Sequence, residues 1–310
     1  MQVLHYPDAP PPKWPQVVAA LGNFDGLHRG HLKLIERVRR QAGECGGTPV
    51  AVTFDPHPSR VLRPDKAPPL LMTLPQKLEA FERAGMQGVV IVRFTPDLAL
   101  WEPELFVEAV LVDWLRVSEV WVGGNFLFGR NRAGTFTLLR TLGGDRGFRC
   151  EKIDSVRYKD FVVSSTRVRH LLAEGRVDEA GALLGHHYFI DGTVVHGDGR
   201  GRELGFPTAN LQSENQLLPA LGIYASIATI NGVHHASVTS VGVRPTIGPG
   251  PVTIETFILD GSPDLYGARL RLAFVRWLRE ERAFDGLDPL KAQMAQDTAD
   301  ARDLFARLAL

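Results

Sequence analysis

Cysteine is scarce in this sequence: Cys45 and Cys150 are the two among 310 residues, and their spacing fits no metal-binding motif. We therefore expect two free thiols rather than a disulfide, as in a reducing compartment. Long apolar runs are missing too, since none approaches the ~20 residues of a membrane span. Several prolines before Val17 leave no room for the apolar core of a signal peptide. These absences predict a cytoplasmic protein with no membrane partner.

An excess of charge of one sign is also missing. The chain has 35 basic and 35 acidic residues, so its formal net charge is zero. A protein that coats a nucleic-acid backbone usually presents a basic face, so we expect no nucleic-acid partner. A local basic pocket for phosphates is still compatible with this balance. The hydrophobic share of 44% is enough for a globular core in one or two domains.

Short β-branched runs alternate with amphipathic stretches in the first half of the chain. This alternation predicts a doubly wound parallel α/β sheet. The expected strands are Val17–Leu21, Val50–Thr53, Gly88–Val92 and Val120–Val122, and the expected helices are His31–Arg40, Pro75–Ala84, Pro103–Leu115 and Thr135–Leu142. Such sheets bind ligands at the carboxyl ends of their strands, so we expect a site in the loops after Leu21, Thr53 and Val122.

After about residue 187 the pattern changes to strand-like segments without helical stretches between them. Asn231-Gly232 between two such runs is a strong hairpin signal. We expect a small antiparallel barrel or sandwich closed by a helix at Pro289–Leu308. Two short helices on either side of Gly175 are expected between the halves, within Ser165–Leu184. The expected strands are Tyr188–Val195, Gly222–Ile230, Gly232–Gly242, Val252–Leu259 and Ala268–Val275.

Two histidines follow the first expected strand. His28 and His31 are three residues apart, so they share a face if a helix begins there. Gly30 between them leaves room for a ligand to approach the backbone. The free N–H groups at a helix start favour a phosphate, and imidazoles can stabilise charge that grows on it. Surface or helix-capping histidines are the simpler alternative, which the paired spacing disfavours.

This His-x-Gly-His pattern resembles the nucleotidylyltransferase superfamily, which transfers a nucleotidyl group from ATP or CTP to a phosphate. Three further segments, in the same order, are similar to prokaryotic FAD synthetases. They are Phe54-Asp55-Pro56-His57-Pro58, Gly123-Gly124-Asn125-Phe126-Leu127-Phe128-Gly129 and Ser164-Ser165-Thr166-Arg167-Val168-Arg169. The resemblance covers the whole first half and implies a nucleotidylyltransferase domain over residues 1–186.

The resemblance also implies roles for single residues. Asn125 and His57 would contact the flavin, although many relatives carry aspartate at the position of Asn125. His57 could equally be a rigid loop residue. Ser165 and Thr166 belong to a second predicted phosphate clamp, and a helix cap made by this serine and threonine is the alternative interpretation. The residues implied to bind ATP or its phosphates are Phe24, Gly26, His28, Gly30 and His31, followed by Ser165, Thr166 and Arg169 as the second clamp.

A glycine-rich segment opens the second half. Gly197, Gly199 and Gly201 alternate with polar residues, so the backbone could fold around an anion and present N–H groups to it. A mobile hairpin explains such glycines equally well. Thr208 and Asn210 lie two apart, so they point to the same side of an extended strand. Their oxygens suit a Mg²⁺ ion that bridges nucleotide phosphates.

The run from Gly205 to Asn210, Gly-Phe-Pro-Thr-Ala-Asn, resembles riboflavin kinases, and later segments agree in order to the end of the chain. The resemblance implies a riboflavin kinase barrel over residues 187–310. It makes Glu255 the general base toward the riboflavin 5′-hydroxyl, and it adds Arg202 to the phosphate contacts and Arg279 to the flavin contacts. Phe257 departs from the family, which usually has histidine there.

Together the two resemblances imply a bifunctional FAD synthetase. It would phosphorylate riboflavin to FMN with ATP and then adenylylate FMN to FAD, with Mg²⁺ as cofactor. One alternative is a monofunctional adenylyltransferase whose barrel only binds flavin, which Phe257 motivates. Another is a flavin-binding regulator, which the presence of both sets of catalytic residues disfavours. A third is an RNA-interacting relative, which the neutral charge disfavours. The expected partners are small molecules, and the protein is expected to be a monomer or weak oligomer.

Overall fold

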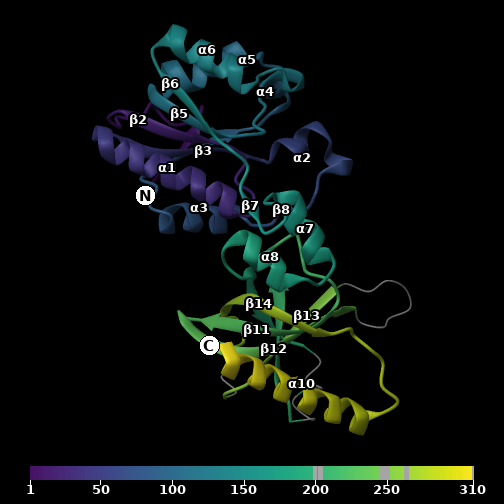
Figure 1. Ribbon diagram of the computed structural model, residues 1–310. Coiled ribbons are helices and arrows are strands. Elements are labelled where there is room, and N and C mark those ends of the chain that lie inside the picture. Colours follow the sequence, from purple (N-terminus) through teal and green to yellow (C-terminus); the bar gives the residue numbers. More distant parts are fainter. Residues whose placement is uncertain (198–200, 202–204, 244–251, 262–264, 309–310) are drawn as a thin grey trace. The chain divides into compact units, whose positions relative to one another are not determined.

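The computed structural model describes residues 1–197, 201, 205–243, 252–261 and 265–308 (Figure 1). The chain divides into two compact units, Met1–Ser164 and Ser165–Leu310. The division lies earlier than the domain boundary expected at 186/187, so the two short junction helices belong to the second compact unit.

The first unit is built on a parallel sheet of six strands. The strand order is β1-β4-β3-β2-β5-β6, and every neighbouring pair is parallel. After β2 the chain adds β3 and β4 on one side and then crosses to β5 on the other, so its direction diverges at the end of β2. The strands are β1 Gln2–Tyr6, β2 Val17–Leu21, β3 Thr48–Asp55, β4 Gly88–Arg93, β5 Val117–Gly123 and β6 Arg149–Ile153.

Helices cover both faces of this sheet. Figure 1 shows α1 and α3 on one face and α5 and α6 on the other. All five residues of β2 are buried because Ala19 and Leu21 enter one core and Val18 and Ala20 enter the other. The elements are α1 Arg29–Cys45, α2 Pro58–Leu62, η1 Pro64–Lys66, α3 Leu74–Arg83, α4 Pro96–Ala99, α5 Pro103–Phe106, η2 Val107–Trp114, η3 Arg130–Arg132 and α6 Phe136–Arg146, with a small hairpin of β7 Arg157–Tyr158 and β8 Phe161–Val162.

The expected doubly wound sheet is confirmed, with two additions and one difference. Edge strands β1 and β6 were not among the expected strands. The helix expected at Pro103–Leu115 begins as α5 and continues as the wider π-helical η2, in which the Leu115 N–H reaches back five residues to the Val110 carbonyl (3.0 Å).

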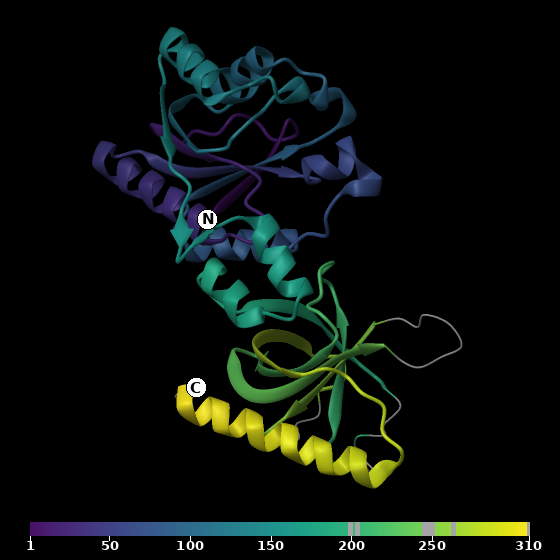
Figure 2. The same cartoon turned by 45° about the vertical axis from the view of Figure 1, so that its right-hand side comes forward.

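The second unit is a closed antiparallel barrel (Figure 2). The strand order is β10-β13-β12-β11-β14-β9, and each neighbouring pair is antiparallel. The barrel prediction is confirmed, although β10 was not counted among the expected strands. The elements are α7 Ser165–Ala173, α8 Val177–Leu184, β9 Tyr188–Val195, β10 Thr208–Ser213, β11 Gly222–Ile230, β12 Val233–Val243, β13 Val252–Ile258, β14 Arg269–Arg279 and α10 Leu287–Leu308.

The expected hairpin between β11 and β12 is present. Asn231 and Gly232 both have positive φ values, 49° and 82°, and Ile230 pairs with Val233 across the turn. Positive φ at both central residues is the requirement of a type I′ turn, whose twist matches that of the strands it joins.

The junction helices are attached to the barrel by specific contacts. The Ala220 N–H donates to the Leu172 carbonyl of α7 (2.9 Å). Gly175, between α7 and α8, lies against the indole of Trp277, since a Cβ there would be 3.6 Å from three ring atoms. These contacts explain why the helices group with the barrel.

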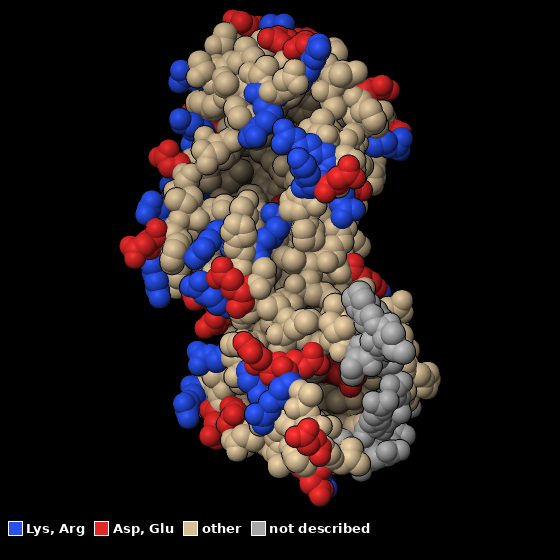
Figure 3. All heavy atoms as spheres, turned by 90° about the vertical axis from the view of Figure 1, so that its right-hand side faces the viewer, with Lys and Arg blue, Asp and Glu red and all other residues tan. Residues whose placement is uncertain are grey.

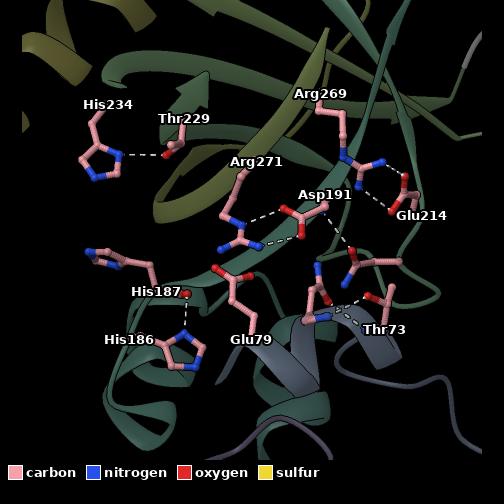
Figure 4. Close-up of polar contacts among 12 residues, drawn as sticks. Thr73, Glu79, His186, His187, Asp191, Glu214, Thr229, His234, Arg269 and Arg271 are labelled. Atoms are coloured by element: carbon pink, nitrogen blue, oxygen red, sulfur yellow. Dashed lines mark hydrogen bonds and ion pairs between the residues drawn. The ribbon is translucent and has the colours of Figure 1, made fainter. Parts of the chain in front are cut away.

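Ion pairs attach β14 to its neighbours where the barrel closes. Arg271 on β14 donates two hydrogen bonds to Asp191 on β9 (2.7 and 2.9 Å; Figure 4). Its guanidinium lies 4.2 Å from the ring centre of Phe189. Arg269 donates two more hydrogen bonds to Glu214, which directly follows β10 (2.8 and 2.9 Å). The first bidentate pair reinforces the ladder between β9 and β14, and the second ties β14 to the end of β10.

Candidate active sites

The loop between β2 and α1 has an unusual backbone. Phe24 and Leu27 are fully buried and have positive φ values of 51° and 38°, and Gly26 between them has a φ of 84°. Positive φ is rare outside glycine, so the loop depends on surrounding contacts to hold its shape. It turns the chain sharply at the carboxyl end of β2, where the sequence predicts phosphate binding.

His28 caps the start of α1. Its Nδ1 accepts a hydrogen bond from the His31 backbone N–H (3.3 Å), which takes the place of a serine or aspartate cap. A neutral imidazole that accepts at Nδ1 carries its proton on Nε2. The cap therefore leaves His28 with an Nε2–H donor. His28 therefore does cap the helix, as the simpler alternative supposed. The cap uses Nδ1, so it is compatible with a phosphate contact through Nε2.

The two imidazole rings stack on each other. Their centroids lie 3.7 Å apart and their planes differ by 10°. A Cβ at position 30 would lie 3.1 Å from the Cε1 of His28, so Gly30 makes room for this ring. Gly30 therefore allows the His28 ring to pack beside it, and its predicted role in the close approach of a ligand stays a prediction.

Both histidines are kept neutral by their surroundings. Burial lowers the pKa of His28 from 6.5 to about 4. Burial also lowers the pKa of His31 well below its usual value, and the charges of His28 and Lys77 lower it further. Desolvation disfavours the charged imidazolium in both cases. A neutral ring at a helix N-terminus still has one N–H group that can donate a hydrogen bond to an anion.

Sequence reasoning missed two buried charged residues, one beside this loop and one inside it. Lys77 of α3 donates to the Asn23 carbonyl (2.9 Å), and both oxygens of Asp25 accept from the Leu71 N–H (3.0 and 3.2 Å). Lys77 is 7% exposed and Asp25 is 3% exposed. In sequence, Lys77 is one lysine of an amphipathic helix, a position that is usually solvated. The signal for Asp25 is its place between Phe24 and Gly26, two residues that sequence reasoning did select.

The other predicted residues of the first unit lie in the loops that follow β3 and β5. Asn125 is exposed in the turn after β5, and His57 follows β3. His57 caps α2, because its Nδ1 accepts from the Ser59 N–H (3.2 Å) and pairs with the Ser59 hydroxyl (2.7 Å). The carboxyl ends of parallel strands meet at one edge, so both loops share an edge with the histidine loop.

Phenylalanine rings form a continuous cluster at this edge. Phe54 is the second-to-last residue of β3, and it contacts Phe94 after β4 and Phe106 of α5, at centroid distances of 5.9 and 6.1 Å. Phe128 continues the row to Phe126, whose ring stacks on it at 5.5 Å. Figure 3 shows a hollow in one face of this unit, with Lys and Arg side chains gathered along its rim. Local positive charge at the rim of a hollow suits a ligand that carries a phosphate.

The predicted second clamp begins α7. Ser165 opens the helix, Thr166 is exposed, and Arg169 lies one turn further along. His28 and His31 belong to the first compact unit, whereas these three residues belong to the second. Their contact with ATP stays a prediction.

In the barrel the structure brings together Thr208, Asn210 and Glu255. Asn210 of β10 stands opposite Glu255 of β13, and Thr208 donates to a Glu255 carboxylate oxygen (3.4 Å). Directly opposed residues of an antiparallel pair project to the same side, as do residues two apart on one strand. The three side chains therefore share one face of the barrel wall.

A row of directly paired residues runs around the barrel from Glu255 to Arg279. Glu255 pairs with Ser240 of β12, Ser240 with Ile223 of β11, and Ile223 with Arg279 of β14. Arg279 donates two hydrogen bonds to Asp297 of α10 (2.8 and 2.7 Å), and Asp297 is 4% exposed. The predicted flavin residue thus ties the terminal helix to the barrel, and its contact with flavin stays a prediction.

Part of the glycine-rich segment packs directly on the Thr208–Asn210 strand. A Cβ on Gly197 would lie 2.1 Å from the side-chain nitrogen of Asn210, and one on Gly201 would lie 2.4 Å from the Phe206 carbonyl oxygen and 3.1 Å from Thr208 Oγ1. Only glycine fits such close approaches. The other two predicted phosphate contacts of this segment, Gly199 and Arg202, lie outside the described residues.

Phe257, where the family usually has histidine, faces the C-terminal helix. It stands opposite Thr208 and packs with the cluster that includes Ala301 and Phe305 of α10. Its ring also meets Phe206 edge-on at 5.3 Å. Phe257 therefore makes an apolar contact on the same face of the barrel wall as Thr208 and Glu255.

The donors present fit a magnesium ion held largely by its substrate. Among the described residues, no group of three or more His, Cys, Asp or Glu side chains is placed to bind a metal. Thr208 and Asn210 supply two hard oxygen donors on one face, next to the Glu255 carboxylate. Mg²⁺ typically binds one or two protein oxygens and takes its other ligands from phosphates and water.

Within the part of the chain that the structure describes, every helix is too short or too polar to cross a bilayer.

Comparison with known proteins gives two family matches. Residues 11–167 match the family model described as FAD synthetase, and residues 184–305 match the one described as riboflavin kinase. The chain is 39% identical over 290 residues to the bifunctional riboflavin kinase/FMN adenylyltransferase of Pseudomonas fluorescens, covering 93% of each chain. It is 36% identical over 297 residues to the protein of that description in Bacillus subtilis, covering 94% and 93%.

A solved structure is similar over the same length. A crystal structure described as a macrolide-efflux protein from Streptococcus pneumoniae matches with a TM-score of 0.88 and 25% identity, covering 97% of this chain and 99% of that one. The likeness in fold therefore includes both the α/β unit and the barrel.

Proposed function

The chain belongs to the bifunctional riboflavin kinase/FMN adenylyltransferase family, and we propose that its two reactions are divided between the two sites described above. It phosphorylates riboflavin to FMN and adenylylates FMN to FAD, with ATP as the donor in both steps. We assign adenylyl transfer to the site of His28 and His31, and phosphorylation to the site of Thr208, Asn210 and Glu255. The observation that supports this division most is that each of these two sets is gathered within one compact unit.

Adenylyl transfer needs charge stabilisation more than it needs covalent chemistry. A phosphate oxygen of FMN attacks the α-phosphorus of ATP, the bond to the β-phosphate oxygen breaks, and pyrophosphate leaves. The Nε2–H of His28 is fixed by the cap at Nδ1, so it can donate to the phosphoryl oxygens as negative charge grows on them. We propose the α1 N-terminus as the phosphate site and Asn125, His57 and the phenylalanine cluster as the flavin side.

Phosphorylation needs a base, because a primary hydroxyl is a poor nucleophile. We propose that Glu255 takes the proton of the riboflavin 5′-hydroxyl. The riboflavin 5′-oxygen then attacks the γ-phosphorus of ATP, and ADP leaves. Thr208 donates to the Glu255 carboxylate and so helps to orient it. We propose that Gly197 and Gly201 bring the backbone close to the ATP phosphates.

Mg²⁺ fits the barrel site as a resident ion, held by Thr208 and Asn210. When bound, it would neutralise phosphate charge and hold the phosphates in place. We also propose that the protein works in the cytoplasm as a monomer or weak oligomer, with small molecules as partners and without nucleic acid or membrane. Its balanced charge supports the absence of a nucleic-acid partner.

The test is chromatography of flavins after the protein is incubated with riboflavin, ATP and Mg²⁺, with a parallel reaction started from FMN. The unaltered protein should convert riboflavin to FMN and then to FAD. The double variant His28→Ala/His31→Ala should accumulate FMN without FAD. The variant Glu255→Ala should leave riboflavin unconverted but still form FAD from supplied FMN.

Two outcomes would contradict this division. If either properly folded variant lost both activities, the two sites would not be separate. If the unaltered protein formed FAD only from FMN, the barrel would bind flavin without phosphorylating it, and Phe257→His would be the first restoration to test.

A further inference from the structure

Lys77 is a buried cation directly under the loop that carries the histidines. Its ammonium group donates to the Asn23 carbonyl (2.9 Å) and reaches the Thr53 hydroxyl at 3.5 Å. The Thr53 hydroxyl donates to the same Asn23 carbonyl (3.2 Å). Lys77 is 7% exposed and Thr53 is fully buried. A lysine is rarely buried to this extent without a specific partner, and its partner here is the backbone of the site loop.

The segment that carries Lys77 holds the loop at two further points. Phe81 lies one helical turn after Lys77 on the same face of α3, and its ring meets Phe24 edge-on at 5.2 Å. Just before α3, the Leu71 N–H donates to both oxygens of Asp25. Consecutive residues Asn23, Phe24 and Asp25 are therefore each held by residues 71–81.

The start of α3 is itself fixed by a reciprocal cap. The Thr73 hydroxyl accepts from the Gln76 N–H (3.3 Å), and the Gln76 side chain accepts from the Thr73 N–H (2.8 Å). This capping box, also drawn in Figure 4, sets where the helix begins and so where Lys77 points.

We propose that Lys77 is a positioning residue for FMN adenylylation, whose buried ammonium holds the Asn23–Asp25 turn so that Phe24 and the cap place the stacked rings of His28 and His31. Phe24 connects the two ends of this arrangement, since its ring meets Phe81 on one side and His31 on the other, both at 5.2 Å. The inference rests on the proposed role of the two histidines.

The charge of Lys77 also acts on the histidines. Burial lowers the pKa of Lys77, and the carboxylates of Asp25 and Asp55 raise it again. The ammonium in turn lowers the pKa of His31, together with burial and His28. Removing this cation should therefore raise the pKa of His31. A side chain that only filled space would have no such effect.

The experiment compares Lys77→Met, Lys77→Arg and the control Lys33→Met in the full-length protein. Lys33 is an exposed lysine of α1, two residues from His31, so its variant also removes one positive charge near the site. For each protein, kcat and KM for FMN adenylylation are measured across pH. Riboflavin phosphorylation on the same chain and the melting temperature are measured in parallel.

We expect Lys77→Met to lower kcat for adenylylation by about tenfold or more, with KM for ATP changed by less than about threefold. The acid limb of its kcat profile should move to higher pH, because His31 has lost a neighbouring cation. Lys77→Arg should keep the acid limb in place and recover most of kcat.

The controls should change little. The kcat for adenylylation of Lys33→Met, and the rate of riboflavin phosphorylation by every variant, should stay within about twofold of the unaltered protein. If Lys77→Met does not fold, Lys77→Gln removes the charge with less disruption and carries the same comparison.

An unchanged kcat in Lys77→Met, or a lower kcat with an unmoved acid limb, would overturn the inference. The double variant His28→Ala/His31→Ala is run in the same assay. If it kept adenylylation, the proposed role of the histidines would fail. If it lost adenylylation while Lys77→Met kept both kcat and acid limb, only the inference about Lys77 would fail.

Discussion

The Nδ1 of His28 accepts the backbone N–H of His31 while the two imidazole rings stack at 3.7 Å, so one histidine both caps the helix and orients the other. Capping is normally done by a short polar side chain. Here it fixes the Nε2–H tautomer of His28 and leaves that proton available to a phosphate. Structure and chemistry therefore depend on different nitrogens of one ring, which makes them separable by mutation.

His28→Asn is expected to separate the two. Asparagine is a good N-cap, so the free energy of unfolding should change by less than about 1 kcal/mol. The Nε2–H donor is lost, and kcat for FMN adenylylation should fall by roughly 10²–10³-fold, as for removal of one donor to a transition state. Steady-state kinetics and urea denaturation check both halves. Full adenylylation activity in His28→Asn would show that the His28 Nε2–H has no part in the reaction.

The buried histidines also predict how stability depends on pH. The folded-state pKa of His28 is lowered to about 4 from 6.5, so between these values the unfolded chain binds a proton that the folded chain does not. The free energy of unfolding should therefore fall as pH falls from 6.5 to 4, by up to about 1.4 kcal/mol per pH unit from each such histidine. Above pH 6.5 this contribution is fully present.

Tryptophan fluorescence can follow this dependence, since four of the five tryptophans lie in the first unit. Urea denaturation at several pH values should give a shallower pH dependence for His28→Asn than for the unaltered protein. Equal slopes for the two proteins would contradict the lowered pKa of His28.

Gly197→Ala tests the close approach of the glycine-rich segment to the strand below it. The added Cβ would fall 2.1 Å from the Asn210 side-chain nitrogen, so Asn210 must move. We expect kcat for riboflavin phosphorylation to fall by about tenfold or more and FMN adenylylation to be unaffected. Gly144→Ala is the control, because nothing lies within 4 Å of its Cβ position in α6. Unchanged phosphorylation in Gly197→Ala would show that this packing is not needed for the reaction.

Asp297→Ala tests the attachment of the terminal helix. It leaves Arg279 half-buried without its carboxylate, and truncating one partner of a buried pair typically costs about 3–5 kcal/mol. We expect the lower end of that range, because Arg279 is 21% exposed. Asp300→Ala, on the exposed face of the same helix, should change the free energy of unfolding by less than about 0.5 kcal/mol. Equal effects of the two variants in thermal or urea denaturation would mean that the pair does not hold α10.

The sequence predicted the elements whose patterns are local. Val17–Leu21 and Gly88–Val92 are apolar runs buried on both faces, which is typical of strands in a covered parallel sheet. The Asn231-Gly232 turn follows from its own two residues. In contrast, β6 reads Arg-Cys-Glu-Lys-Ile and lies at an edge, where alternating polar residues give little signal.

Residues whose roles depend on distant partners could not be predicted. Lys77 is buried because it meets Asn23, which is 54 residues earlier in the chain. Asp25 is held by a backbone group 46 residues away. The His28–His31 pair and the Thr208–Asn210 pair could be selected from sequence because the two members of each pair are close in the chain. Residues three apart share a face of a helix, and residues two apart share a side of a strand. Glu255 was found by family resemblance, since nothing in its local sequence distinguishes it from an exposed strand residue.

The closure of the barrel between β9 and β14 has a consequence for how the chain is made. Asp191 and Arg271 are 80 residues apart, so the seam cannot form on the ribosome until the first half of β14, Arg269–Phe274, has emerged. The parallel sheet of the first unit is complete once β6 has been synthesised. Contacts of large sequence separation also slow folding because their loops must close first. We therefore expect the α/β unit to be folded while the barrel is still an open set of strands, so that the nascent chain gains its two activities in the reverse of the order in which the flavin uses them.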